Sequence, residues 1–363
     1  LFFIQNDSLH ESIASYPPIS QVSIHRTVVY IKDSAQIMPR HRKHFVHGTV
    51  VEVTFRVEVG LPFVQTSYMR LIVESYLARA QYRYPITICA VVVMGNHVHM
   101  LLVVKDPEAV PKFLEYFKRE TAHAVNRLWG RHKQTVWCEG YDSPVVLDAA
   151  KVVQRLVYFY TNPQRARLVD TIEEYGQFHT WKEFLSGSGA VRVVPCFPRF
   201  AVPTLTSVEH ACLRDAAQQI YDLILTERDG DIELLIEPFA WMACFASTEG
   251  ITTREVIDAV LQQVRSAEGI FVAERGSATQ SLGFTTDTTF RPRKWGRRMI
   301  CLGSERSDRA KYIQWFLHAA AKAKLGIQDW MVHHLPLKVP PGFFAPGGKL
   351  FANIIPKLSV SAR

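Results

Sequence analysis

The sequence predicts an α+β fold: an antiparallel sheet packed against helices, followed by a mostly helical C-terminal domain. Residues 50–59 (VVEVTFRVEV) are rich in β-branched side chains, as strands are. Two apolar runs, residues 86–93 and 97–104, are separated by a Gly-Asn turn, a pattern typical of an antiparallel hairpin. Beyond residue 205 the sequence changes to longer segments with helical periodicity.

The helices of the first domain follow from the spacing of its apolar residues. In residues 66–80 these residues recur at helical spacing and form one stripe. A second helix covers about 106–128, with Pro107 or Pro111 in its first turn, where proline is tolerated. A third helix spans 148–162 and is expected to stop at the proline that follows.

Shifts in composition divide the chain into four parts. These are an N-terminal extension (1–43), an α+β domain (44–187), a Gly-, Ser- and Pro-containing linker (188–205) and a mostly helical, basic C-terminal domain (206–363). In the last part, helical periodicity is found near 208–228, 253–266 and 307–325. The acidic stretch 227–237 is interpreted as a solvated turn.

The overall composition is that of a globular protein with a basic balance. Hydrophobic residues make up 48%, charged residues 21%, and the formal net charge is +8. Such a charge suits a polyanion such as nucleic acid, although many proteins are mildly basic. The six cysteines occur singly with no CxxC pair, which argues against a zinc ribbon or a disulfide framework. No apolar run reaches about 18 residues, so we expect no membrane span and a cytoplasmic protein.

A His-x-His pair is the first candidate for chemistry. His97 and His99 lie two residues apart on a predicted strand and therefore project from the same face. Two imidazoles on one rigid strand can supply half of a metal site. Taken alone, this pattern is common and usually incidental.

The helix at 148–162 adds a second group of candidates. At 100° per residue, Tyr158 and Asn162 fall on its polar stripe, one turn apart, whereas Tyr160 points towards the core. The alternative is that Tyr158 is an ordinary tyrosine on an amphipathic surface.

Together these segments resemble a known family. MGNHVHMLLVV resembles the strand with the His-hydrophobic-His signature of HUH endonucleases, and YFYTNPQRARLV is similar to the tyrosine helix of REP-associated single-strand DNA transposases. FKRETAHAVNRLWGR, VWCEGYDSPVVLD and EYGQFHTWKEF resemble other segments of that family, in the same order. The resemblance covers residues 46–186. The family often has Met-Pro-Asn before the histidines, where this chain has Met-Gly-Asn, so we expect a similar hairpin with a slightly looser register.

The resemblance implies a metal-dependent, tyrosine-nucleophile transposase. His97 and His99 would hold one divalent cation, Mg²⁺ or Mn²⁺, with the Asn162 side-chain oxygen as the third protein ligand; Zn²⁺ is the competing metal. Tyr158 would attack a DNA phosphate to leave a 5′-phosphotyrosine and a free 3′-hydroxyl. The implied partner is single-stranded DNA with hairpin-containing element ends, bound by a monomer or a homodimer.

Basic residues supply candidate DNA contacts, although charges on a helix face are usually only solvated. On the middle helix and the tyrosine helix the candidates are Lys118, Arg119, Arg127, Lys151, Arg155 and Arg165. In the C-terminal domain, RPRKWGRR interleaves a tryptophan with five cations, a pattern that binds phosphates and stacks on bases, or else a solvated loop with a buried tryptophan. Its candidates are Arg291, Arg293, Lys294, Trp295, Arg297 and Arg298.

Other functions remain open at this stage. The chain could be a domesticated or inactive HUH-like DNA-binding regulator, or a nicking enzyme of replication or conjugation. A metal-dependent hydrolase that activates water is a third possibility, and in that case the tyrosine would be dispensable.

Overall fold

The computed structural model describes residues 43–58, 66–205, 213–275 and 299–344. Nearly all of the expected N-terminal extension therefore lies outside the described residues. The described part forms one sheet of seven strands in the order β5-β6-β2-β3-β1-β4-β7. The strands are β1 (Val50–Arg56), β2 (Thr87–Val93), β3 (His97–Val103), β4 (Val145–Val146), β5 (Ala190–Cys196), β6 (Gly230–Ile236) and β7 (Cys301–Leu302).

The three central strands are antiparallel, as the sequence predicts. β2 and β3 form the expected hairpin, and β1 pairs with the other side of β3. Side chains alternate between the two faces of the sheet: Val98 and Met100 pack into one core, while Leu101 and Val103 pack into a second core on the opposite face. Both faces are covered, which explains the nearly continuous apolar runs in the sequence.

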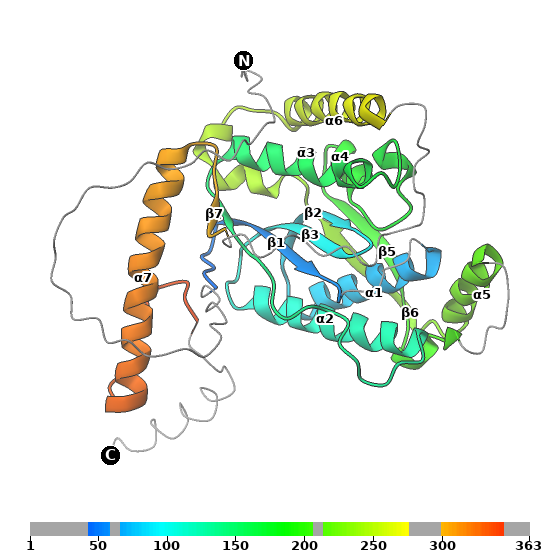
Figure 1. The fold of residues 1–363 in the computed structure, drawn as a ribbon, viewed down its shortest axis with the longest axis horizontal. Helices are drawn as coiled ribbons and strands as arrows, with labels where there is room; N and C mark the ends of the chain where they lie inside the picture. The colour runs from blue at the N-terminus through cyan, green and yellow to red at the C-terminus, as the bar shows by residue number, and fades with distance from the viewer. Residues whose placement is uncertain (1–42, 59–65, 206–212, 276–298, 345–363) are drawn as a thin grey trace. The chain divides into compact units, whose positions relative to one another are not determined.

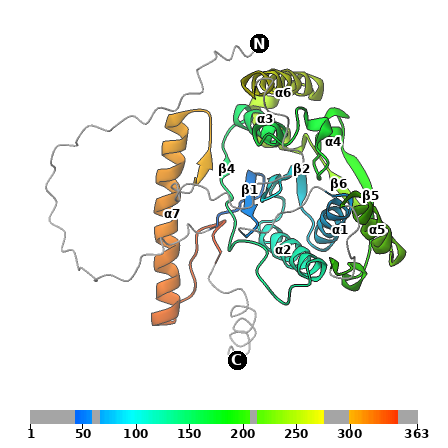
Figure 2. The same cartoon turned by 45° about the vertical axis from the view of Figure 1, so that its right-hand side comes forward.

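Helices form a layer on each face of the sheet (Figures 1 and 2). α1 (Ser67–Arg83), α2 (Ala109–Leu128) and α5 (Leu213–Thr226) pack on the face of Met100. α3 (Ala149–Arg165), α4 (Trp181–Leu185) and α6 (Thr253–Arg275) pack on the face of Leu101. α7 (Arg306–His333) follows β7 and contributes Phe316 and Ala323 to a smaller cluster. In the described residues, no helix is both long and apolar enough to cross a membrane.

The helix predictions are confirmed in type, with shifted ends. Thr66 caps α1 by accepting a hydrogen bond from Met69 N at 3.3 Å. The predicted stop before Pro163 is wrong, because α3 continues to Arg165. Proline costs the helix one N–H donor, but hydrogen bonding continues beyond it, since Ala166 N donates to Asn162 O at 3.0 Å.

Two predictions for the region after residue 187 are wrong. Residues 190–196, expected to belong to a linker, form β5, and most of the acidic stretch forms β6, its antiparallel partner. β6 also pairs in parallel with β2 at Ile236, which extends the central sheet. Burial of Leu234 and Ile236 stabilises the strand, although charged neighbours conceal this pattern in the sequence.

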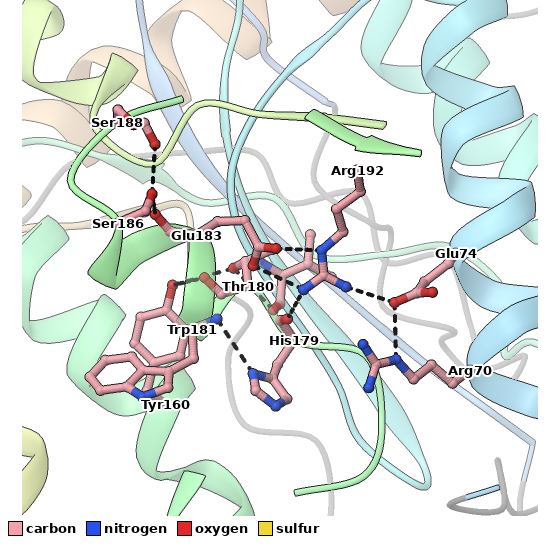
Figure 3. Close-up of polar contacts among 11 residues, drawn as sticks. Arg70, Glu74, Tyr160, His179, Thr180, Trp181, Glu183, Ser186, Ser188 and Arg192 are labelled. Atoms are coloured by element: carbon pink, nitrogen blue, oxygen red, sulfur yellow. Dashed lines mark hydrogen bonds and ion pairs between the residues drawn. The ribbon is translucent and has the colours of Figure 1, made fainter. Parts of the chain in front are cut away.

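A polar network holds β5 against the first domain (Figure 3). Arg192 donates to both carboxylate oxygens of Glu183, to Glu74 at 2.7 Å and to His179 O at 3.1 Å. Glu74 also accepts a hydrogen bond from Arg70 at 3.0 Å. Because Arg192 and its two acidic partners are largely buried, the network fixes the strand by charge-assisted hydrogen bonds.

Candidate active site

Strands β1 and β3 present a row of polar side chains to helix α3. In the antiparallel register Thr54 lies opposite His99, and Arg56 lies opposite His97. Glu52, two residues before Thr54, projects from the same face. These residues continue the face that carries Leu101, so the sheet brings them under the helix predicted to hold the nucleophile.

The two histidines and Asn162 lie close together, as the family resemblance implies. The ring centroids of His97 and His99 are 4.7 Å apart, and Asn162 Nδ2 lies 3.2 Å from His97 Nε2. The Nδ1 atoms of both rings face oxygen atoms: His97 Nδ1 is 2.5 Å from Asn96 Oδ1, and His99 Nδ1 is 3.0 Å from Thr54 Oγ1. A proton on Nδ1 of each ring therefore leaves both Nε2 lone pairs available.

This arrangement fits a divalent cation. His99 Nε2 is buried and has no hydrogen-bond partner in the described part of the chain. Rotating the Asn162 amide would exchange its nitrogen for its oxygen beside His97 Nε2. Two imidazole nitrogens and one carboxamide oxygen can bind a divalent cation, with water at the remaining positions. No cluster of three or more His, Cys, Asp or Glu side chains in the described residues could hold a metal, so Asn162 is needed to complete this set.

Tyr158 lies beside the histidine pair, on the half-exposed side of α3. Its ring centroid is 5.4 Å from that of His99, with the two rings perpendicular. The guanidinium carbons of Arg155 and Arg165 lie 4.0 Å and 5.2 Å from the Tyr158 ring centroid. The prediction that Tyr160 points into the core is confirmed, because its side chain is fully buried.

Burial determines the charge states of the candidate ligand residues. It lowers the pKa of His97 well below its ordinary value, and the positive charges of His99 and Arg56 act in the same direction. Burial also lowers the pKa of His99, against the opposing effect of Glu52. Neutral imidazoles are the form that binds a metal. Burial alone would raise the pKa of Glu52, but hydrogen bonds with His99 and Arg155 outweigh it and lower that pKa, which favours the carboxylate.

The predicted DNA-contacting residues fall into three groups. Lys151, Arg155 and Arg165 lie on α3 near the site, although Lys151 binds Gln154 and Arg155 is paired with Glu52. The second group lies on α2, across the sheet from Tyr158, and its side chains have partners within the chain. Lys118 donates to Cys138 O and Gly140 O, Arg119 is paired with Glu115 and Glu120, and Arg127 donates to Val202 O. The third group lies outside the described residues: Arg291, Arg293, Lys294, Trp295, Arg297 and Arg298.

Sequence reasoning missed three members of the site: Glu52, Thr54 and Asn96. The two β1 residues could have been found by strand alternation, because a glutamate and a threonine interrupt the apolar run with a period of two. Their position beside His99 depends on the register of β1 against β3, which the sequence does not specify.

Comparisons with known proteins agree with the motifs. Residues 50–158 match the family described as IS200-like transposases. Among solved structures, the chain is similar to a REP-associated tyrosine transposase bound to a REP hairpin. The two are 14% identical, the match covers 41% of this chain and 86% of that one, and the TM-score is 0.34. A comparison with curated proteins finds no match. The family match confirms the resemblance that the sequence predicted.

Proposed function

We propose that this chain, whose residues 50–158 match the IS200-like transposase family, cleaves and rejoins single-stranded DNA through a 5′-phosphotyrosine intermediate. One observation carries the proposal. Tyr158 on α3 lies beside His99, whose buried Nε2 has no hydrogen-bond partner in the described residues, and His97 Nε2 faces the Asn162 side chain at 3.2 Å. A protein that only binds DNA has no need of this combination.

The site holds the groups that the reaction requires. A bound Mg²⁺ or Mn²⁺ would neutralise charge on the non-bridging oxygens of the scissile phosphate. The Tyr158 oxygen attacks phosphorus, the bond from phosphorus to the 3′-oxygen breaks, and the proton that leaves the phenol is balanced by the one that the 3′-oxygen gains. The exposed guanidinium of Arg165 can add positive charge where the phosphate binds.

The same residues account for rejoining. The phosphotyrosine bond conserves the energy of the phosphodiester, so a 3′-hydroxyl from another strand end can attack it and release Tyr158 without ATP. Strand transfer of this kind is what a transposase requires. The similar REP-associated transposase is bound to a REP hairpin, and we propose hairpin-bearing single strands as the substrate of this chain.

The test is covalent capture of labelled DNA. Purified protein with Mn²⁺ and a 3′-labelled single strand that carries a hairpin and its flanks should give an adduct stable in denaturing gels. Tyr158→Phe should abolish the adduct. Tyr82→Phe is the matched control, because Tyr82 lies on α1 and is 82% exposed.

Each alternative function predicts a different result. Cleavage that survives Tyr158→Phe would indicate a hydrolase that activates water. Binding without cleavage by the wild-type protein would indicate a DNA-binding regulator. An adduct at an unchanged level in Tyr158→Phe would assign the nucleophile to another residue. Any of these results would overturn the proposal.

A further inference from the structure

Glu52 is a buried carboxylate with two different partners in the candidate site. It is only 4% exposed, and it lies on β1, which pairs with the histidine strand β3. Its Oε2 accepts a hydrogen bond from Arg155 Nε at 2.5 Å, and its Oε1 accepts one from Arg155 Nη2 at 2.7 Å. The same Oε1 lies 3.4 Å from His99 Nδ1.

The first partner, Arg155, places its guanidinium beside the ring of Tyr158. Two parallel hydrogen bonds fix the plane of the Arg155 guanidinium as well as its position. That guanidinium carbon lies 4.0 Å from the centroid of the Tyr158 ring. The carboxylate thereby limits where Tyr158 can lie, and it occupies two of the five N–H donors of Arg155.

The second partner is His99, whose imidazole ring the carboxylate orients. A carboxylate beside Nδ1 favours the tautomer with the proton on that nitrogen, which directs the Nε2 lone pair of His99 away from β1. Thr54 Oγ1, at 3.0 Å from the same nitrogen, restrains the ring further. The tyrosine half and the histidine half of the site thus share one carboxylate.

We propose that Glu52 is a positioning residue that aligns Tyr158, through Arg155, with the cation ligand His99. This inference rests on the function proposed above. It predicts that loss of the carboxylate weakens cation binding and slows cleavage together. A purely structural ion pair would affect only stability.

The chain offers a matched control in Glu120. This carboxylate is 2% exposed and also receives two hydrogen bonds from one arginine, Arg199, at 2.7 Å and 2.6 Å. It lies on α2, whose core is on the opposite face of the sheet from Tyr158. Glu120→Gln therefore removes a similar buried charge without touching the site.

The experiment compares Glu52→Gln and Glu120→Gln in the full chain. Mn²⁺ affinity is measured without DNA by calorimetry, and adduct formation is measured in single turnover at saturating Mn²⁺ and DNA. Glu52→Gln should raise the Kd for Mn²⁺ about tenfold and slow the adduct at least about tenfold, as is usual when the residue that orients a metal ligand is removed. Glu120→Gln should change neither value more than about twofold.

Further variants keep the test decisive. If Glu52→Gln does not fold by circular dichroism, Glu52→Asp replaces it with the same expectation, because a side chain shorter by one methylene cannot reach both partners. Arg155→Lys should slow the adduct while the Kd for Mn²⁺ rises less than about twofold.

The outcomes separate this inference from the proposed function. An active wild-type protein whose Glu52 variants keep its rate and its Kd for Mn²⁺ would overturn this inference alone. Equal effects of Glu52→Gln and Glu120→Gln would do the same. A wild-type protein that forms no adduct would overturn the proposed function and this role of Glu52 with it.

Discussion

Glu268 on α6 should determine how firmly the tyrosine helix is held. This side chain is 5% exposed and accepts hydrogen bonds from Gln164 Nε2 at 2.7 Å, Ile172 N at 2.9 Å and Arg265 Nη1 at 2.7 Å. Gln164 is two residues after Asn162, so Glu268 supports the end of α3 that carries the candidate ligand.

The expected effect of Glu268→Ala follows from the partners that it would leave behind. The buried Gln164 amide and the Ile172 N–H would lose their acceptor, and an unsatisfied buried donor costs about 1–3 kcal/mol. Arg265 would keep Glu173, to which it donates at 2.6 Å and 3.1 Å, so its charge would remain paired. We therefore expect a loss of about 2–6 kcal/mol in the free energy of unfolding.

The assay is urea denaturation followed by far-ultraviolet circular dichroism, combined with adduct formation by the folded variant. Glu274→Ala is the control, because Glu274 is exposed on the same helix. It should change the free energy of unfolding by less than about 0.5 kcal/mol. If Glu268→Ala were as stable as Glu274→Ala, the reasoning that α6 secures α3 through this carboxylate would be refuted.

Three more predictions concern other parts of the chain. Burial lowers the pKa of His179 to about 4, so between pH 4 and pH 6.5 the unfolded state binds more protons than the folded state, and the free energy of unfolding should fall by up to about 3 kcal/mol as the pH drops through this window. In denaturation measured at a series of pH values, His179→Gln should lack this fall in the free energy of unfolding. Arg192→Met should destabilise the fold by about 3–5 kcal/mol, because it leaves the largely buried Glu183 carboxylate unpaired and leaves Glu74 with Arg70 alone. Arg254→Met, at an exposed pair, should cost under about 0.5 kcal/mol in the same assay. Replacing the five basic residues of 291–298 with glutamine should reduce the slope of log binding constant against log salt concentration by about 0.7 for each phosphate that they neutralise. If fluorescence anisotropy titrations gave an unchanged slope, DNA binding by this segment would be contradicted.

Local patterns in the sequence predicted the central hairpin and the faces on which the candidate side chains lie, and the family resemblance joined these side chains into one site. A two-residue period placed His97 and His99 on one face, and a 3.6-residue period placed Tyr158 and Asn162 on one side of a helix. Both relations depend only on the geometry of a single element. The fold then brings the two elements together, at 3.2 Å between His97 Nε2 and Asn162 Nδ2.

Contacts between distant segments could not be predicted in the same way. Glu52 reaches Arg155 across 103 positions of the sequence, and nothing local to either residue indicates its partner. β5 could not be predicted for a different reason. Its outward Val191 and Val193 are exposed, while its inward Arg192 is largely buried. This inverts the usual rule that apolar residues point inward and charged ones outward.

The family match ends at Tyr158, yet the groups that hold this tyrosine in place continue well beyond it. At the start of α3, Asp148 caps the helix and also accepts hydrogen bonds from Ser304 N and Oγ, both at 2.7 Å. At the other end, Glu268 binds Gln164. Both supports come from the region after residue 205, which the sequence presented as a separate helical domain. That region also adds β6 and β7 to the sheet. Segments outside the matched residues therefore support both ends of the tyrosine helix. Removing that region should therefore expose the apolar side of α3 and loosen the alignment of Tyr158 with the histidine pair, even though every candidate catalytic residue would remain in the chain.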